Sequence, residues 1–415
     1  MNFEAIYSWV RDLPVVDWHN HLDMRMLAED RPLGSLYEVW VKADPYKHRA
    51  MRICGEAERV ITGDAAECEK WAAWMRTLPK LVGNPLFAWA KMELAFLRGI
   101  GNGELGTGGP RLSRPQTGGP QSSAAEKWWE GVENVSLSDW TPRKVLKKFN
   151  VEYLSPCVGL EGLENLDSLD CLEGLDGIGI HPSLRMNAGD AVDMETLEKF
   201  KAAGCKVVDI SVDDVSQLNA AGWGHSALPA VAAYAAAHGW TMLLHMGALR
   251  ETSARLRAAA GPAGGFAGMR APVDPAAVAS FLNMLEAGPS GLPRTILMSL
   301  NPEAHAQLAV LAGSFSGEGM PGKVQLGPAW WWCDHEDGIR DVLEKNAAYG
   351  VLSTFVGMTT DSRSLLSFVR HDYFRRILCR WVAEKVAAGA FPDDEALLRP
   401  LLENVCYKNA KGMVS

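Results

Sequence analysis

The stretch "LPVVDWHNHLDM", residues 13–24, joins a short apolar run to two histidines that stand two residues apart. If the run is a β-strand, His19 and His21 point to the same side, because side chains alternate along a strand. Two neutral imidazoles aimed at one point are a common arrangement for binding a divalent metal ion. A pair of exposed histidines at a strand end is an equally good interpretation of this stretch alone, so the rest of the sequence has to decide.

Composition narrows the class of protein. The chain has 415 residues, 47% hydrophobic and 22% charged, which suits a large barrel or two to three domains. Its longest apolar runs fall short of the roughly 18 residues of a membrane helix, and its first residues lack the apolar core of a secretion signal. The net charge of −9 argues against nucleic acid as the main partner. We therefore expect a cytoplasmic protein with no membrane or nucleic-acid partner, whose eight scattered cysteines are reduced thiols.

Eight short apolar runs predict β-strands, and helical patterns stand between many of them. In the segment 337–350, for example, Ile339, Val342, Leu343 and Ala347 share one helical face, and Gly350 supplies a C-terminal stop. Strands that alternate with helices indicate parallel βαβ units, and eight of them predict an α/β fold of the (β/α)₈ TIM-barrel type. The predicted strands are 15–19, 151–156, 177–182, 206–211, 241–246, 295–300, 323–327 and 354–361.

The first and second predicted strands are about 130 residues apart, far more than one helix requires. The intervening sequence is rich in Trp, Leu and helix-forming residues. We therefore predict a barrel formed by residues 1–25 and 140–415, with a helical insertion subdomain at 26–139. Within it, the Gly- and Pro-rich stretch 101–123 lacks the strand-then-helix context of a phosphate-binding loop, and we predict a surface loop or lid there.

Potential metal ligands stand at the ends of several predicted strands. His19 and His21 end the first, His245 ends the fifth, and Asp361 ends the eighth. In a (β/α)₈ barrel these ends meet at one face, where active sites are built. Any one of these residues alone would be an ordinary structural side chain, but their convergence favours a metal site over exposed histidines.

These motifs occur in longer segments that resemble the uronate isomerase (glucuronate isomerase) family of the amidohydrolase superfamily. The resemblance extends over nearly the whole chain and is densest after residue 240. The segments that carry it include "HNHL", "AEDRPL" (28–33), "YKHRAMR" (46–52), "LPKLVGNPL" (78–86), "LHMGALR" (244–250), "SLNPEAHAQLAVLAGSFSG" (299–317), "KVQLGPAWWWCDHEDGI" (323–339) and "FVGMTTDSRSLLSFVRHDYFRRILC" (355–379).

The resemblance implies a metal-dependent aldose–ketose isomerase of the D-glucuronate to D-fructuronate type, which transfers a proton between C2 and C1 through an enediol. It also implies that His19, His21 and Asp361 bind the metal, with His245 as a further candidate ligand. Zinc and manganese both suit such ligands. Many binuclear relatives carry a histidine where this chain has Leu300 and Asn301, so we expect one metal ion.

The resemblance assigns further roles to residues of this chain. Asp361, Tyr46 and Arg363 match catalytic positions, with Tyr46 assisting proton transfer. An arginine fork suits the carboxylate of a sugar acid, the expected small-molecule partner. Arg185, Trp330 and Trp331 match positions that contact the substrate, and Trp332 is as compatible with packing as with contact. We also expect a homo-oligomer.

The sequence departs from the family on the side of the predicted second to fourth strands. Pro45 and Ile210 stand where relatives have histidines, and "SPCVGL" (155–160) replaces an acidic stretch. We therefore expect D-glucuronate and D-galacturonate to be poor substrates, because unmade polar contacts discriminate strongly. Two alternatives stay open: a hydrolase or lyase of a related sugar acid that uses a metal-bound hydroxide, and a catalytically silent binding protein.

Overall fold

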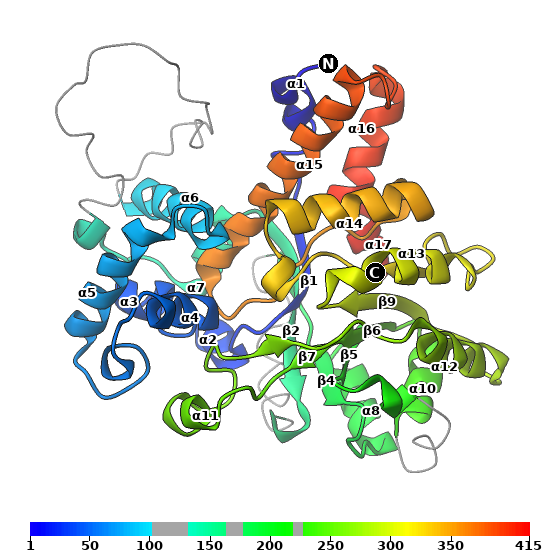
Figure 1. The fold of residues 1–415 in the computed structure, drawn as a ribbon, viewed down its shortest axis with the longest axis horizontal. Coiled ribbons are helices and arrows are strands. Elements are labelled where there is room, and N and C mark those ends of the chain that lie inside the picture. The colour runs from blue at the N-terminus through cyan, green and yellow to red at the C-terminus, as the bar shows by residue number, and fades with distance from the viewer. Residues whose placement is uncertain (102–131, 163–176, 219–226) are drawn as a thin grey trace.

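The computed structural model describes residues 1–101, 132–162, 177–218 and 227–415, and the predicted loop at 101–123 lies almost wholly outside these ranges (Figure 1). Its centre is a curled sheet of seven parallel strands in the order β1-β2-β4-β5-β6-β9-β10, and a short strand, β3 (Gly179–Ile180), pairs with β2. The seven are β1 (Val15–Asn20), β2 (Val151–Gly159), β4 (Ser183–Asn187), β5 (Val207–Val212), β6 (Thr241–Met246), β9 (Arg294–Ser299) and β10 (Val324–Leu326).

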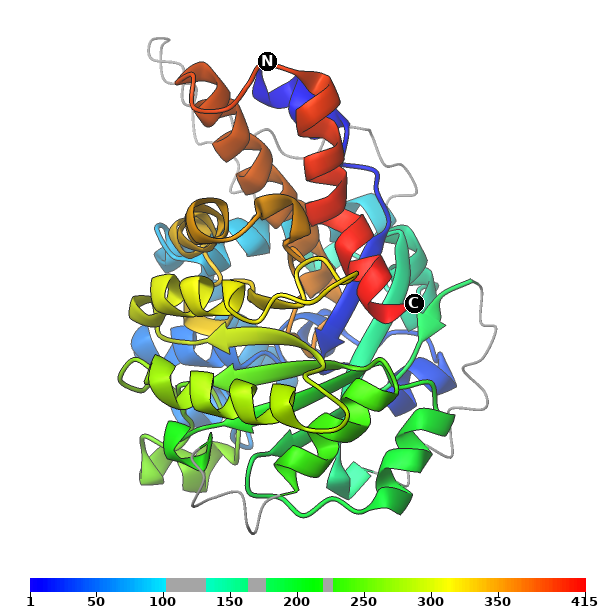
Figure 2. The same ribbon diagram turned by 90° about the vertical axis from the view of Figure 1, so that its right-hand side faces the viewer.

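Helices cover the outer side of this sheet (Figures 1 and 2). Most of them follow a strand, and α10 packs on β6 and α13 on β10. They are α8 (Met194–Ala202), α10 (Leu228–Ala237), α12 (Pro275–Ala287), α13 (His305–Gly313) and α14 (Glu336–Tyr349). The predicted face of α14 is confirmed, because Ile339, Val342 and Leu343 are buried and the helix ends at Gly350.

The segment between β1 and β2 contains only helices among its described residues. They are α2 (Met24–Glu29), α3 (Leu36–Trp40), α4 (Pro45–Ile53), α5 (Glu67–Thr77), α6 (Pro85–Gly101) and α7 (Pro142–Lys148). In α4, Asp44 caps the first turn by accepting hydrogen bonds from the backbone N–H groups of Tyr46 and Lys47, and Pro45 supplies the fixed φ that suits a first helical position. This capping fixes where the Tyr46 side chain leaves the helix.

The remaining elements lie at the two ends of the chain or border the site. The terminal helices are α1 (Phe3–Ser8), α15 (Val369–Ala387), α16 (Glu395–Glu403) and α17 (Asn409–Val414), and α1 packs on α15 at the top of the view in Figure 1. Two short strands, β7 (Ala248–Leu249) and β8 (Gly268–Met269), form a separate antiparallel pair, and α11 (Ala254–Ala260) lies between them in the sequence. None of the helices in the described ranges is long and apolar enough to span a bilayer.

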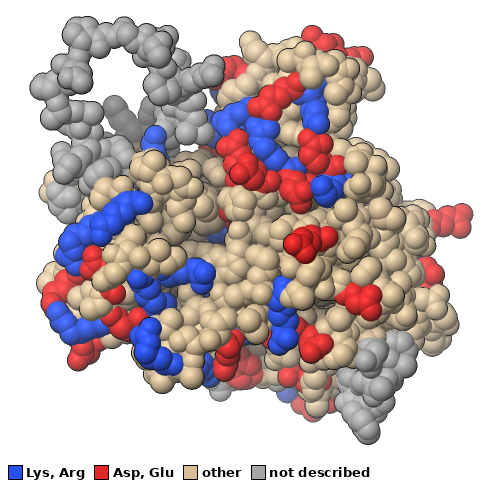
Figure 3. Space-filling model, viewed as in Figure 1, with Lys and Arg blue, Asp and Glu red and all other residues tan. Residues whose placement is uncertain are grey.

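Charged side chains of both signs alternate over α14 and α15 on the surface (Figure 3). There Arg340 forms an ion pair with Glu384, and Arg380 forms one with Glu336. Such exposed pairs contribute little to stability, so the joining of these two helices depends mainly on their buried apolar faces.

Successive side chains of a strand point to opposite faces of the sheet, so the buried apolar residues of the strands form two separate clusters. Val207 and Leu243 belong to an inner cluster with residues of β1, β2 and β9, whereas Val208 and Leu244 belong to the larger core that includes the helices. Residues two positions further along a strand point to the same side. Asp209 and His245 therefore face the inner, concave side, and Ile210 faces the helices.

Two predicted strands differ in the structure. The run 177–182 forms only the two-residue β3, and the sheet strand is the next segment, β4. Pro182 separates them, because it has no N–H to donate to a neighbouring strand. The run 354–361 is not a strand, because Gly357 and Asp361 have φ values of 75° and 46°, which are incompatible with extended backbone.

The segment 359–362 nevertheless lies beside β1. The backbone N–H of Asp361 donates to the carbonyl of His19, and that of His21 donates to the carbonyl of Ser362. The buried carboxylate of Asp17 supplies further contacts: Thr360 donates to it from both its backbone N–H and its hydroxyl at 2.7 Å, and the hydroxyl of Thr359 lies 2.9 Å away. His371 of α15 contacts the same carboxylate at 3.2 Å.

We expect Asp17→Asn to lower the free energy of unfolding by about 1–3 kcal/mol, measured by urea denaturation. An amide has one acceptor oxygen where the carboxylate has two, so at least one buried donor loses its partner. Asp12→Asn is the control, because the Asp12 side chain is 81% exposed and should change stability by less than about 0.5 kcal/mol. Equal effects of the two substitutions would show that Asp17 does not hold the segment.

Candidate metal and substrate site

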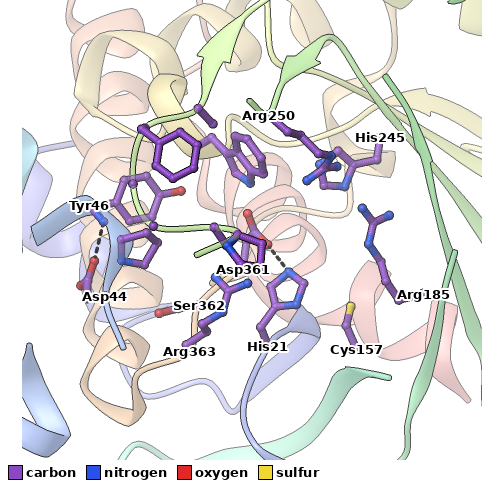
Figure 4. A pocket seen from close by; sticks show the side chains of 18 of the residues that line it. His21, Asp44, Tyr46, Cys157, Arg185, His245, Arg250, Asp361, Ser362 and Arg363 are labelled. Carbon is purple, nitrogen blue, oxygen red and sulfur yellow. Dashed lines mark hydrogen bonds and ion pairs between the residues drawn. The ribbon is translucent and has the colours of Figure 1, made fainter. Parts of the chain in front are cut away.

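The two histidines of the opening stretch meet Asp361 at the end of β1, and Figure 4 shows the contact of His21 with Asp361. The Oδ1 atom of Asp361 lies 3.1 Å from Nε2 of His19 and 3.1 Å from Nε2 of His21. His19 and Asp361 are buried, and His21 is partly exposed to the cavity above. The predicted convergence of these three side chains is therefore present in the structure.

His245, at the end of β6, lies next to this group. Its ring centroid is 6.3 Å from that of His19, and its Nδ1 lies 3.2 Å from Oδ1 of Asp209 on β5. The Nε2 atom of His245 and the Oδ2 atom of Asp361 are buried and have no hydrogen-bond partner among the described residues. Buried polar atoms are rarely left unpaired, so both indicate a place for a bound group.

The electrostatics of the cluster suit a cation. Burial alone would raise the pKa of Asp361, but the hydrogen bonds from His19 and His21 hold it well below its usual value. Burial lowers the pKa of His245 to about 4, which leaves a neutral imidazole with an available nitrogen lone pair. Burial also disfavours charge on His19, but Cys157, Asp209 and Asp361 together raise its pKa well above the usual value.

Two overlapping groups of side chains have donor atoms within 4.8 Å of one another: His19, His21 and Cys157, and His19, Asp209 and His245. Neutral imidazoles and carboxylates are ligands that divalent transition metals accept. The donor set and the unpaired atoms of His245 and Asp361 therefore fit the metal ion that the sequence predicts.

A cavity of about 380 Å³ opens above this cluster, within the size range of small-molecule sites. Tyr46 enters it from α4, and burial together with the nearby Asp361 carboxylate raises the pKa of its phenol well above 10, so the hydroxyl keeps its proton. The lining of the cavity includes His21, Tyr46, Cys157, Arg185, His245, Arg250, Trp331, Trp332, Asp361 and Arg363.

Three arginines line the cavity, and they differ in their partners. Arg185 places Nη1 3.1 Å from Oδ2 of Asp209, and Arg250 contacts the carboxylate of Asp213 at 3.0 Å. Arg363 is exposed and forms no ion pair with any carboxylate of the described residues. It is therefore the arginine that is free to meet an anionic ligand.

The three consecutive tryptophans have different positions. Trp330 is buried behind the site, with its ring centroid 3.7 Å from that of His245, and it does not line the cavity. Trp331 lines the cavity and has a φ of 50°, a strained value for a bulky residue. Trp332 also lines the cavity and packs edge-on against Tyr46 with 5.5 Å between centroids.

The outer rim of the cavity is formed by α4 and the segment 262–267. Arg49 donates from Nη1 to the carbonyl of Ala267, and Arg52 donates to the carbonyl of Gly264. Gly265 approaches the start of α4 so closely that a Cβ atom there would lie 2.3 Å from the carbonyl oxygen of Pro45. The rim is thus one packed unit that joins two distant parts of the chain.

Comparison with known proteins agrees with this geometry. The profile of the glucuronate isomerase family matches residues 2–222 and 194–414. A uronate isomerase of Serratia proteamaculans is 33% identical over 458 aligned positions, which cover 98% of this chain and 94% of that protein. The chain belongs to the glucuronate isomerase family. The predicted family is therefore confirmed, and with it the enzyme class, an aldose–ketose isomerase of hexuronates.

Solved structures give the same result for the fold. The crystal structure of a uronate isomerase from Thermotoga maritima has a TM-score of 0.80 and 26% identity, covering 100% of this chain and 97% of that one. The crystal structure of a glucuronate isomerase from Caulobacter crescentus has a TM-score of 0.79 and 19% identity, covering 99% and 93%. The second likeness concerns the fold alone.

The departures from the glucuronate isomerase family differ in where they lie. Pro45 lines the cavity, so a histidine at that position would face a ligand. Ile210 belongs to the core between the sheet and the helices and does not line the cavity. The expected loss of two imidazoles from the pocket is therefore reduced to one. His48 does not line the cavity and cannot replace it.

Sequence reasoning missed Arg250 and Cys157 as cavity residues. Both follow the rule that located the histidines: Cys157 is near the end of β2, and Arg250 directly follows β7 just beyond β6. Placing polar residues at every strand end would have found them. The sequence could not predict whether the Trp332 side chain packs or contacts a ligand. The left-handed backbone conformation of Trp331 determines which of the three consecutive tryptophan rings face the cavity.

We expect Gly265→Ala to raise KM for substrate several-fold, because its Cβ would push the rim segment away from Pro45. Gly261→Ala is the control: both glycines have positive φ (82° and 71°) and incur a backbone cost of about 1–3 kcal/mol, but a Cβ on Gly261 meets nothing within 4 Å. Steady-state kinetics and urea denaturation separate the two effects. Equal KM values for the two variants would contradict a role of this contact in shaping the cavity.

Proposed function

We propose that the chain interconverts a hexuronate and its 2-keto isomer by proton transfer between C2 and C1 through an enediol, with one zinc or manganese ion. The observation that carries the proposal is the position of Asp361. Its carboxylate lies between the Nε2 atoms of His19 and His21 and forms the floor of a cavity that Tyr46 and Arg363 also line.

The metal ion would be held by His19, His21 and Asp361, with His245 as a neighbour whose free Nε2 is available to it or to a substrate oxygen. Such an ion supplies Lewis acidity that stabilises negative charge on a carbonyl or hydroxyl oxygen. Imidazole and carboxylate ligands do not distinguish zinc from manganese. The protein's own groups then have to hold the sugar and move the proton.

Asp361 and Tyr46 are the groups we assign to proton transfer. The Oδ2 atom of Asp361 has no partner among the described residues, so it is available to accept a proton from C2 while Oδ1 faces the two histidines. The raised pKa of Tyr46 keeps its hydroxyl protonated, so it can donate a hydrogen bond or a proton to the developing oxyanion.

Arg363 is the group we assign to the substrate carboxylate, because it lines the cavity without an acidic partner in the described ranges. Arg185 would assist, although its Nη1 is shared with Asp209. Trp331 provides an apolar surface beside the sugar, and Trp330 supports it indirectly by packing against His245. Together they would orient an open-chain sugar acid with its carbonyl end toward the two histidines.

Pro45 supports a substrate other than the common hexuronates. A lost hydrogen bond to an ionised or buried group costs on the order of 1.5–3 kcal/mol, or roughly ten- to a hundredfold in kcat/KM. We therefore propose that D-glucuronate and D-galacturonate are poor substrates and that a differently configured or substituted sugar acid is preferred. Pro45→His should raise the activity on one of these two hexuronates.

Two features of the architecture are also proposals: a complete barrel and a helical insertion. We propose that residues 355–361 complete an eight-membered (β/α)₈ barrel between β10 and β1; the hydrogen bonds of Val356 to Gln325 and of Asp361 to His19 support this. We also propose that residues 26–139 form a helical insertion in a barrel of residues 1–25 and 140–415. A cytoplasmic homo-oligomer stays a prediction from the sequence.

The proposed reaction predicts exchange of the C2 proton with solvent. Candidate hexuronates incubated in D₂O with zinc- or manganese-loaded protein should incorporate deuterium at C2, observed by NMR, and removal of the metal with a chelator should abolish the exchange. A hydrolase or lyase would change the carbon skeleton or release a fragment without this exchange. Bond cleavage in place of exchange, or exchange that persists in metal-free protein, would refute the proposal.

The assignment of Arg363 predicts a selective loss of acidic substrates. Arg363→Met should lower kcat/KM for a hexuronate by about 10- to 100-fold, because a charge-assisted hydrogen bond is removed, and should change that for the neutral aldose much less. Arg399→Met is the control, because Arg399 lies on α16 and pairs with Glu395 and Glu403 away from the cavity. Equal losses for the acid and the neutral aldose would indicate packing and contradict the assignment.

A further inference from the structure

We propose that Cys157 is a positioning residue of the metal site, whose sulfur accepts a hydrogen bond from Nδ1–H of His19 and thereby directs Nε2 toward the metal. The inference rests on the proposed role of His19 as a ligand. The Sγ atom of Cys157 lies 3.2 Å from Nδ1 of His19, on the opposite side of the ring from Asp361, which lies 3.1 Å from Nε2.

The sulfur belongs to a continuous polar network beneath the cluster. The hydroxyl of Ser183 donates to it at 3.3 Å, and its own S–H points to Oδ2 of Asp209 at 4.0 Å. Asp209 in turn accepts from Nδ1 of His245 at 3.2 Å. One buried carboxylate thus supports His245 directly and His19 through Cys157.

The position of the sulfur favours a supporting role over direct ligation. An imidazole that binds a metal through Nε2 carries a proton on Nδ1, and that proton requires an acceptor. Metal-binding histidines in proteins usually donate this proton to a carboxylate or a backbone carbonyl. In this chain the atom at hydrogen-bond distance is Sγ, and the unpaired Nε2 of His245 and Oδ2 of Asp361 mark the ligand side of the cluster.

The contact of Cys157 with His19 gives a reason for the departure from the family at residues 155–160. Cys157 lies in the stretch 155–160, and it lines the cavity while being partly exposed. Its sulfur is a weaker acceptor than a carboxylate oxygen, but Ser183 and Asp209 hold it in place from two other sides. The sulfur of Cys157 therefore provides an acceptor for Nδ1–H of His19 at this position.

The test measures zinc affinity of metal-free, full-length protein by competition with a chromophoric chelator. Cys157→Ala should weaken zinc binding by about 10- to 100-fold, the usual effect of removing an outer partner of a ligand histidine. Cys157→Ser should stay within about threefold of the unchanged protein, because a hydroxyl also accepts from Nδ1–H. Cys205→Ala is the control, since its buried thiol donates to the carbonyl of Val207 at 3.2 Å and is not among the candidate metal ligands of the described residues.

A second readout separates this role from direct ligation. Cobalt-loaded protein should show no sulfur-to-cobalt charge-transfer absorption, and its visible spectrum should be the same in Cys157→Ser. A charge-transfer band that disappears in Cys157→Ser would overturn the inference by showing a cysteine ligand, and so would zinc affinity unaffected by Cys157→Ala. If the unchanged protein binds no zinc or cobalt at all, the proposed function fails as well, so the two failures can be told apart.

Discussion

The carboxylate of Asp17 fixes the geometry on which the site depends. Among the described residues, β1 pairs with no strand other than β2, so the segment that carries Asp361 is held by Asp17 through Thr359 and Thr360 and by two backbone hydrogen bonds. His371 of α15 contacts the same carboxylate and ties it to the outer helices. Burial would raise the pKa of Asp17, but these partners lower it, so the group is ionised in the folded protein. Without this anchor, nothing in the regular sheet would place Asp361 between two imidazoles.

Two residues of the site adopt left-handed backbone conformations, which are uncommon outside glycine. Asp361 has a φ of 46° and Trp331 a φ of 50°. Each such conformation costs of order 1–3 kcal/mol and persists only where surrounding contacts determine it. For Asp361 those contacts come from β1, and for Trp331 they come from the tilted ring of Trp330 and from the guanidinium of Arg250, which lies over the Trp331 ring. The packing around the curled sheet therefore holds both residues in conformations that free chains avoid.

The sequence predicted those parts of the structure that depend on local pattern. Apolar runs located most strands, and the strand-end rule placed His19, His21 and His245 together. The eighth predicted strand, 354–361, was wrong because Thr359 and Thr360 form hydrogen bonds with the side chain of Asp17 in place of regular strand pairing. These contacts join residues more than 340 positions apart in the sequence. Ile210 was assigned to the pocket from the family pattern, but the pleat of β5 turns it to the helices. The role proposed for Cys157 depends on the contact of its sulfur with His19, which the sequence alone does not show.

The side chains of the candidate metal site lie far apart in the sequence, and this has a consequence for biosynthesis. His19 and Asp361 are 342 positions apart, so the cluster cannot assemble until nearly the whole polypeptide has left the ribosome. Contacts of such long range are slow to form, because the intervening chain has to be ordered first. A metal ion bound by this cluster would therefore be acquired late in maturation, after the first and last parts of the chain have packed together.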